Sequence, residues 1–146
     1  MRSFALLALT VPLSACAAGS AEPPPGTAPP MVVVSESEVM MREAPPHGAI
    51  GMSTAYRISD AAPQPRGMEF RRRVLDVGAA VGEHRIGHDE VYYVTSGHGV
   101  VISDGVEAPI GPGMAAYLYG WAVVGIRQTG DEPLSIIIAY PVPKDD

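Results

Sequence analysis

Two histidines and a glutamate that could act together lie between residues 84 and 90, as His84, His88 and Glu90. Residues two apart share a face of an extended strand, so His84 and Ile86 lie on one face of one strand, and Glu90 and Tyr92 lie on one face of the next. His88 has the same parity as His84, and a shift of the connecting loop would bring all three groups around one ion. Two imidazoles and one carboxylate resemble the facial triad that holds non-haem iron with open positions.

A simpler interpretation needs no metal ion. His84 and Glu90 would then hydrogen-bond each other or a bound molecule inside a pocket. We favour this interpretation, because three protein ligands are the usual minimum for a catalytic ion. A buried carboxylate beside an imidazole would still have a perturbed pKa, and such pairs occur at functional sites more often than in scaffolds. No catalytic residue follows from the sequence.

The segments that must position these groups are short and rich in β-branched and aromatic residues, and glycine, proline and aspartate separate them. This texture is typical of strands, and Asp104-Gly105 is the strongest hairpin turn among them. Many short strands with no helical period predict an all-β fold, either a sandwich or a closed barrel. We expect strands at 53–58, 68–76, 90–95, 99–103, 106–110, 115–119, 123–128 and 134–140.

The residues before this region divide into two segments. Residues 1–15 have a positive start and an apolar run of signal-peptide length, which is too short to span a bilayer. Residues 16–45 contain proline clusters and predict a disordered tether, within which residues 32–34 could add an edge strand. The barrel domain is expected over residues 46–146.

The net charge of the chain limits which kinds of macromolecule it could bind. The chain of 146 residues carries a formal net charge of −6, with its acidic residues scattered, and this argues against nucleic acid as a partner. The only basic run is Arg71-Arg72-Arg73, which falls inside an expected strand. Its arginines should alternate between the two faces, so we interpret it as a solvated or ion-paired strand.

The segment from Gly78 to Gly97 resembles the first motif of the cupin superfamily. His84, Glu90 and Gly97 occupy the motif positions at the expected spacings, and Ile86 stands where the second histidine should be. The resemblance extends over residues 68–140. It implies a single cupin-type barrel, which is a double-stranded β-helix or jelly roll, following the proline-rich tether.

The second cupin motif is weaker. Counted from Gly113, Tyr119, Trp121 and Val124 replace the family's proline, glycine and histidine. A complete cupin site binds a divalent transition metal through three histidines and a glutamate, of which only His84 and Glu90 remain here. The resemblance therefore implies no cofactor as the first expectation, with iron, manganese, nickel or zinc held by His84, His88 and Glu90 as the alternative.

On the family's geometry, the inward faces of these strands form a mostly apolar and aromatic lining, which is typical of a small-molecule pocket. The expected pocket residues are His84, Ile86, Glu90, Tyr92, Tyr117, Tyr119, Trp121 and Val124.

The sequence Leu13-Ser14-Ala15-Cys16 resembles the bacterial lipobox. The resemblance implies cleavage before Cys16 and lipidation of its thiol, and several acyl chains anchor a protein firmly in a membrane. No aspartate follows Cys16, as in lipoproteins of the outer membrane. We expect the chain in the cell envelope, at the periplasmic face of the outer membrane; an ordinary secretory signal with a chance cysteine is the alternative.

Three functions are compatible with these features. The first is a lipid-anchored cupin that binds a small organic ligand and has a degenerate metal site. The second is a metal-dependent enzyme, similar to a dioxygenase or an isomerase, that uses His84, Glu90 and His88. The third is a structural module that forms a homodimer, as many cupins do. Enzyme activity stays open, and we lean against it.

Overall fold

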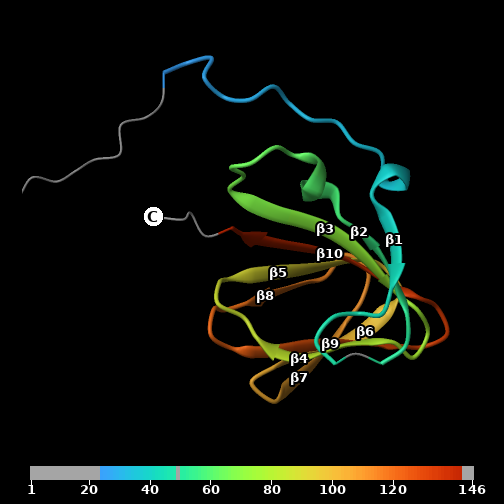
Figure 1. Ribbon diagram of the computed structural model, residues 1–146. Coiled ribbons are helices and arrows are strands. Elements are labelled where there is room, and N and C mark those ends of the chain that lie inside the picture. Colours follow the sequence, from blue (N-terminus) through green and yellow to red (C-terminus); the bar gives the residue numbers. More distant parts are fainter. Residues whose placement is uncertain (1–23, 49, 143–146) are drawn as a thin grey trace, which may run out of the picture.

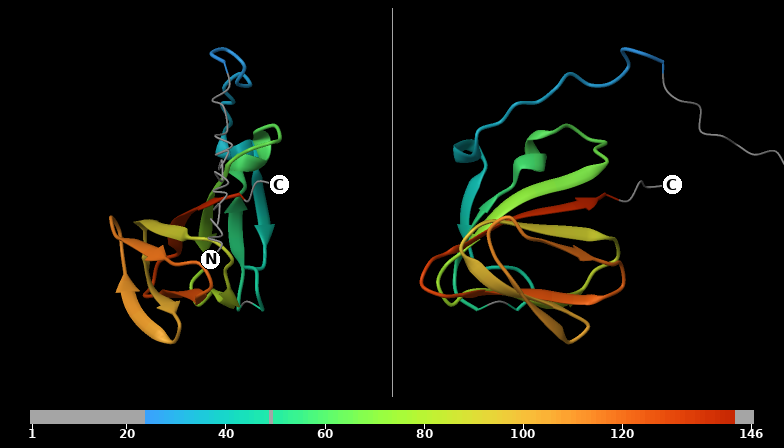
Figure 2. Two further views of the ribbon diagram at one scale, coloured as in Figure 1. Left: turned by 90° about the vertical axis from the view of Figure 1, so that its left-hand side faces the viewer. Right: turned by 180° about the vertical axis from the view of Figure 1, so that it is seen from behind.

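A computed structural model of the chain describes residues 24–48 and 50–142, and within them the strands form two antiparallel sheets that face each other (Figures 1 and 2). One sheet has six strands in the order β1-β2-β3-β10-β5-β8, and the other has four in the order β4-β9-β6-β7. The bounds are β1 Met40–Glu43, β2 Ser53–Tyr56, β3 Met68–Leu75, β4 Ala80–Arg85, β5 Glu90–Ser96, β6 His98–Ser103, β7 Val106–Ile110, β8 Ala115–Leu118, β9 Val123–Thr129 and β10 Leu134–Pro141. The expectation of an all-β barrel is confirmed.

Two short 3-10 helices, η1 Glu36–Glu38 and η2 Ile58–Ala61, are the only helices in the described part of the chain. η2 shortens the strand expected at 53–58, which ends at Tyr56. Neither helix has the length needed to cross a membrane. The predicted signal peptide and Cys16 lie outside the described residues.

The N-terminal edge of the larger sheet differs from the expectation. The expected tether includes residues 40–43, but these residues form β1, which pairs antiparallel with β2 from Met40–Tyr56 to Glu43–Ser53. Their sequence lacks an apolar–polar alternation, and backbone pairing together with the ion pair of Arg42 and Asp76 holds them instead. Residues 32–34, the expected candidate for an extra strand, carry no strand.

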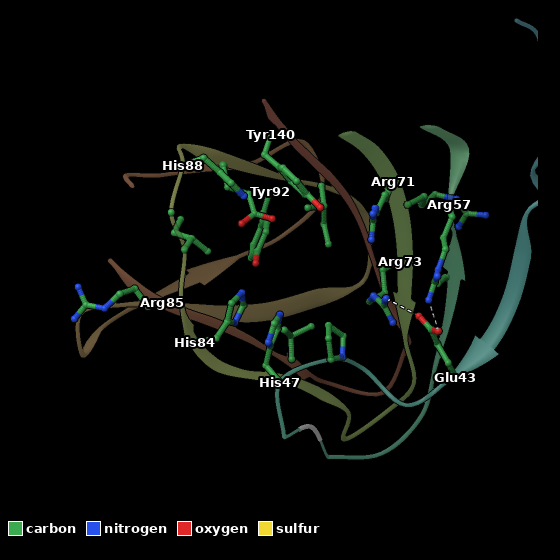
Figure 3. A pocket seen from close by; sticks show the side chains of 18 of the residues that line it. Glu43, His47, Arg57, Arg71, Arg73, His84, Arg85, His88, Tyr92 and Tyr140 are labelled. Atoms are coloured by element: carbon green, nitrogen blue, oxygen red, sulfur yellow. Dashed lines mark hydrogen bonds and ion pairs between the residues drawn. The ribbon is translucent and has the colours of Figure 1, made fainter. Parts of the chain in front are cut away.

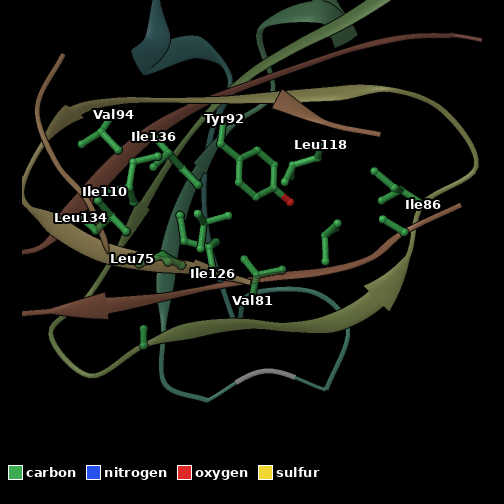
Figure 4. Close-up of a cluster of buried hydrophobic side chains, with 14 residues drawn as sticks. Leu75, Val81, Ile86, Tyr92, Val94, Ile110, Leu118, Ile126, Leu134 and Ile136 are labelled. Atoms are coloured by element: carbon green, nitrogen blue, oxygen red, sulfur yellow. The ribbon is translucent and has the colours of Figure 1, made fainter. Parts of the chain in front are cut away.

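The core lies between the two sheets, where alternate strand residues point inward (Figure 4). The residues of this core are mainly β-branched, because β-branched side chains pack well on a pleated surface. The hairpin predicted at Asp104-Gly105 is confirmed: both residues have positive φ, 47° and 77°, as a type I′ turn requires. The largest of the fully buried apolar side chains are Leu75, Tyr92, Val94, Val124, Ile126, Leu134 and Ile136.

Candidate ligand pocket

A cavity of about 520 Å³ lies between the sheets, and polar and charged side chains surround it (Figure 3). β3, β5 and β10 of the larger sheet form one wall, and β4 with the loop that follows it forms another. The lining residues are Glu43, Ala44, Pro46, His47, Ala55, Arg57, Arg71, Arg72, Arg73, Val81, His84, Arg85, Ile86, Gly87, His88, Glu90, Tyr92, Ile138 and Tyr140.

Strand β3 contributes three arginines to the lining of this cavity, and two of them lie on its inward face. Leu75 is part of the core, and strand alternation places Arg73, Arg71 and Glu69 on the same inward face. In the register of the sheet, Arg71 lies opposite Ile138, which lies opposite Tyr92. Arg71 therefore stands in the middle of the cavity wall. The run Arg71–Arg73 is ion-paired, as the sequence predicts. The sequence analysis did not predict that these arginines also line the cavity.

Arg73 is buried and belongs to a partly buried ion-pair network. Its guanidinium donates to Glu43 at 2.8 Å and to the Ser53 hydroxyl at 2.6 Å, and Arg57 donates to the second Glu43 oxygen at 2.8 Å. Burial raises the pKa of Glu43, but the hydrogen bonds and charges of Arg73 and Arg57 outweigh it and hold that pKa below its ordinary value. The Glu43 carboxylate thus forms ion pairs with two guanidinium groups, so the cluster of Arg73, Arg57 and Glu43 carries a net positive charge.

Arg71 is paired on one side only. Its Nε and Nη2 atoms both lie 3.0 Å from the same oxygen of Glu69, a carboxylate that Arg66 also contacts. Its remaining nitrogen, Nη1, has no hydrogen-bond partner among the described residues. Figure 3 shows Arg71 and Arg73 on the same side of the cavity.

Glu90 is the most perturbed acid of the site. Its side chain is 5% exposed on β5, and no described residue hydrogen-bonds it. Burial raises its pKa to about 7, and the charge of Arg71 opposes that rise. Arg71 and Glu90 form no ion pair, but both line the cavity, so its wall holds a fixed cation and a carboxyl group whose pKa is raised.

His47 reaches the cavity from a segment that we name the strap, residues 44–48, which leaves β1 and crosses to β4 (Figure 1). The His47 ring stacks on that of His84, with centroids 3.6 Å apart. Burial lowers the pKa of His47, and the charges of His84 and Arg73 lower it further. His47 has φ 66°, a left-handed conformation that is uncommon for a residue with a side chain.

The groups proposed as an alternative metal site do not converge. Nδ1 of His84 lies 2.9 Å from the Gly82 carbonyl, while the ring of His88 stacks on Tyr140 at 4.3 Å between centroids. His84 and Glu90 do not hydrogen-bond each other either. In residues 24–48 and 50–142, no group of three or more histidine, cysteine, aspartate or glutamate side chains is arranged to hold a metal ion. The donor set present here does not fit one.

Four of the eight expected pocket residues line the cavity: His84, Ile86, Glu90 and Tyr92. Val124 points inward as expected but is completely buried in the core beneath it.

The three aromatic residues expected in the pocket lie on the surface instead, because Tyr117, Tyr119 and Trp121 are 56%, 70% and 71% exposed. The register explains Tyr117: β8 places Leu118 opposite Glu90 and Ala116 opposite Tyr92, so those two residues take the inward face. Tyr117 donates instead to the Asp89 carboxylate at 2.5 Å.

Sequence reasoning missed Arg71, Arg73, Glu43 and Tyr140 as lining residues. A period-two count backward from the core residue Leu75 would have found the two arginines. For Glu43 no such signal existed, because β1 was not expected.

Residues 71–140 match the family model described as the cupin domain. No curated protein matches the chain. Among solved structures, the chain is similar to a protein of Thermotoga maritima described as a predicted oxalate decarboxylase, at 27% identity and a TM-score of 0.68, covering 77% of this chain and 100% of that one.

Two further structures share the fold at lower identity. The polyketide cyclase RemF of Streptomyces resistomycificus has 17% identity and a TM-score of 0.64, over 76% of this chain and 79% of its own. A cupin 2 conserved barrel domain protein of Salinispora arenicola has 23% identity and a TM-score of 0.53, over 60% and 74%.

Proposed function

Since residues 71–140 match the cupin domain, we propose that the barrel binds a small organic ligand in its cavity without a metal ion. The observation that carries this proposal is the cavity itself. Its volume of about 520 Å³ lies within the range of small-molecule sites. It also contains polar groups that the protein leaves unpaired, namely the Glu90 carboxyl and Nη1 of Arg71.

Water still reaches both groups, and the Arg71 side chain is 31% exposed. A ligand that displaces this water must supply a partner in its place, because a polar group left without one costs free energy. A ligand with both polar and apolar parts would provide that partner. Its apolar part has Val81, Ile86 and Ile138 to pack against, and its polar part has the charged groups. This division resembles binding sites in which a few polar groups fix the orientation of the ligand.

The proposal is tested by elemental analysis and by mass spectrometry of the chain purified without added metal. We expect no stoichiometric transition metal, no change in the thermal unfolding midpoint with a chelator, and a higher midpoint with at least one small organic compound. One equivalent of metal that disappears in His84→Ala would overturn the proposal, and Glu83→Gln, an exposed change on the same strand, is the control.

A second candidate is a metal-dependent enzyme, and the observation that favours it is the 27% identity to the predicted oxalate decarboxylase of Thermotoga maritima. Against it stand Ile86 and Val124, which occupy two of the four usual ligand positions with side chains that cannot bind a metal. The elemental analysis separates the two candidates directly.

The lipid anchor is part of the proposed function. We expect Cys16 to carry the acyl chains that hold the domain in the cell envelope, since it is the only cysteine and follows a lipobox-like sequence. Metabolic labelling with a fatty-acid analogue should mark the unaltered chain and Ala18→Ser, but not Cys16→Ser. Equal labelling of Cys16→Ser would contradict the anchor.

A further inference from the structure

We propose that the ligand is a small organic acid and that its carboxylate binds the Arg71 guanidinium. This inference rests on the proposed ligand-binding function and names the chemical class that the cavity selects. It starts from the charges around the cavity, where five arginines line the wall against two glutamates.

The five arginines differ in how fully the protein itself satisfies them. Arg72 donates two hydrogen bonds to Glu36, and Arg73 uses both terminal nitrogens on Ser53 and Glu43. Arg57 shares Glu43 with Arg73 through Nη2, and its Nε atom is buried without a hydrogen-bond partner. Acids therefore hold these three side chains in place. The fourth, Arg85, is exposed and donates to the Trp121 carbonyl, and its side chain points away from the cavity (Figure 3).

Arg71 is held differently. Glu69 occupies Nε and Nη2 and has a second cation in Arg66, so it neutralises Arg71 only in part. Nη1 of Arg71 is left over, on a side chain that rises from the middle of the inward face of the sheet. Figure 3 shows Arg71 facing the space that His84 and His47 enclose from the other wall.

A neutral ligand in this cavity would exclude water from Arg71 without replacing the hydrogen bonds that water makes. That exchange is unfavourable, because a desolvated charge without a partner is costly. A carboxylate instead supplies both the acceptor oxygen and the opposite charge, and charge-assisted hydrogen bonds are stronger than neutral ones. The geometry therefore favours an anion over a neutral molecule of the same shape.

The apolar residues at two cupin ligand positions fit the same interpretation. Ile86 and Val124 supply no donor atoms for a metal, and the positive charge next to the cavity comes from arginines, three of which belong to β3. A guanidinium binds a planar carboxylate through parallel N–H donors and cannot be deprotonated in proteins.

The first test uses the unaltered chain and matched probes in calorimetric titrations: oxalate, succinate and benzoate against oxamide, succinamide and benzamide, with inorganic phosphate as a simple anion. We expect at least one acid to bind at least tenfold more tightly than its own amide and more tightly than phosphate. Amides that bind as tightly as their acids would overturn the inference and leave the proposed ligand binding intact. If no probe of either class binds, both fail. Binding of phosphate but of none of the three organic acids would also overturn the inference that the ligand is an organic acid.

The second test locates the contact. Arg71→Gln should weaken binding of the best acid at least tenfold, Arg71→Lys should weaken it less, and Arg127→Gln should leave it unchanged. Arg127 is the matched control because its guanidinium pairs with Glu107 outside the cavity. Unchanged acid binding in Arg71→Gln would overturn the assignment of Arg71. If Arg71→Gln does not fold, Arg71→Lys and the acid-to-amide ratio of the unaltered chain decide the question.

Discussion

The carbonyl oxygen of His47 occupies the space in which the Cβ atom of any residue other than glycine at position 82 would lie. A Cβ atom at position 82 would lie 1.8 Å from that oxygen. The same contact brings the amide of Gly82 to the Pro46 carbonyl and the His47 ring onto His84. Gly82 is therefore the position on β4 that allows the strap to close one side of the cavity.

Gly82→Ala should displace the strap, because the added methyl group overlaps backbone atoms that cannot rotate away. We expect a loss of stability of about 1–3 kcal/mol, the usual cost of overpacking. The pKa of His47, lowered by burial and by the charges of His84 and Arg73, should rise toward its ordinary value. Thermal unfolding and histidine NMR titration measure both effects. Gly67→Ala is the control, since its methyl group meets no atom within 4 Å; equal behaviour of the two variants would contradict the role of Gly82.

Glu90→Gln should stabilise the protein at high pH. Burial raises the pKa of Glu90 from 4.5 to about 7, so the folded state holds a proton that the unfolded state releases. The stability of the unaltered chain therefore falls as the pH rises from about 4.5 to 7, and the full cost is present above that range. The variant avoids a cost on the order of 3 kcal/mol at pH 8 and should gain nothing at pH 4. Chemical unfolding at both pH values measures the difference; a variant no more stable than the unaltered chain at pH 8 would contradict the burial of a charged Glu90.

Glu43→Gln should destabilise the chain by about 3 kcal/mol, the low end for breaking a buried ion pair, because it leaves Arg73 and Arg57 without their shared acid. The low end applies because 22% of the Glu43 side chain is exposed. Glu107→Gln removes an exposed pair with Arg127 and should change the free energy of unfolding very little. Similar losses in the two variants would show that the network of Arg73 is no stronger than a surface pair.

Replacing both Ile86 and Val124 with histidine should create a metal site. Val124 lies opposite His84 in the sheet, and both replaced side chains are buried and face the barrel interior. Three imidazoles and Glu90 then provide the ligands that transition metals prefer. We expect one equivalent of Ni²⁺ or Zn²⁺ by elemental analysis and a higher unfolding midpoint with the metal. Adding Glu90→Gln should weaken binding; metal binding that does not depend on Glu90 would place the ion elsewhere.

Much of the fold and part of the site follow from the sequence. Strand periodicity and turn residues predicted eight of the ten strands to within two residues at either end, since β-branched runs and the Asp104-Gly105 hairpin act locally. They missed β1 and β4. Motif spacing identified His84, Ile86, Glu90 and Tyr92 as lining residues, because alternation along a strand fixes which residues share a face.

Tertiary structure alone decided the rest. The strap and β1 join the barrel through backbone contacts with Gly82 and β2, and such contacts leave no local pattern in the sequence. The register between β5 and β8 turned Tyr117 outward, although its own strand was predicted correctly. The sequence determined that two ligand positions are apolar; only the packing of distant strands decided that arginines of β3 would face the same cavity, because burial and charge pairing depend on neighbours far apart in the chain.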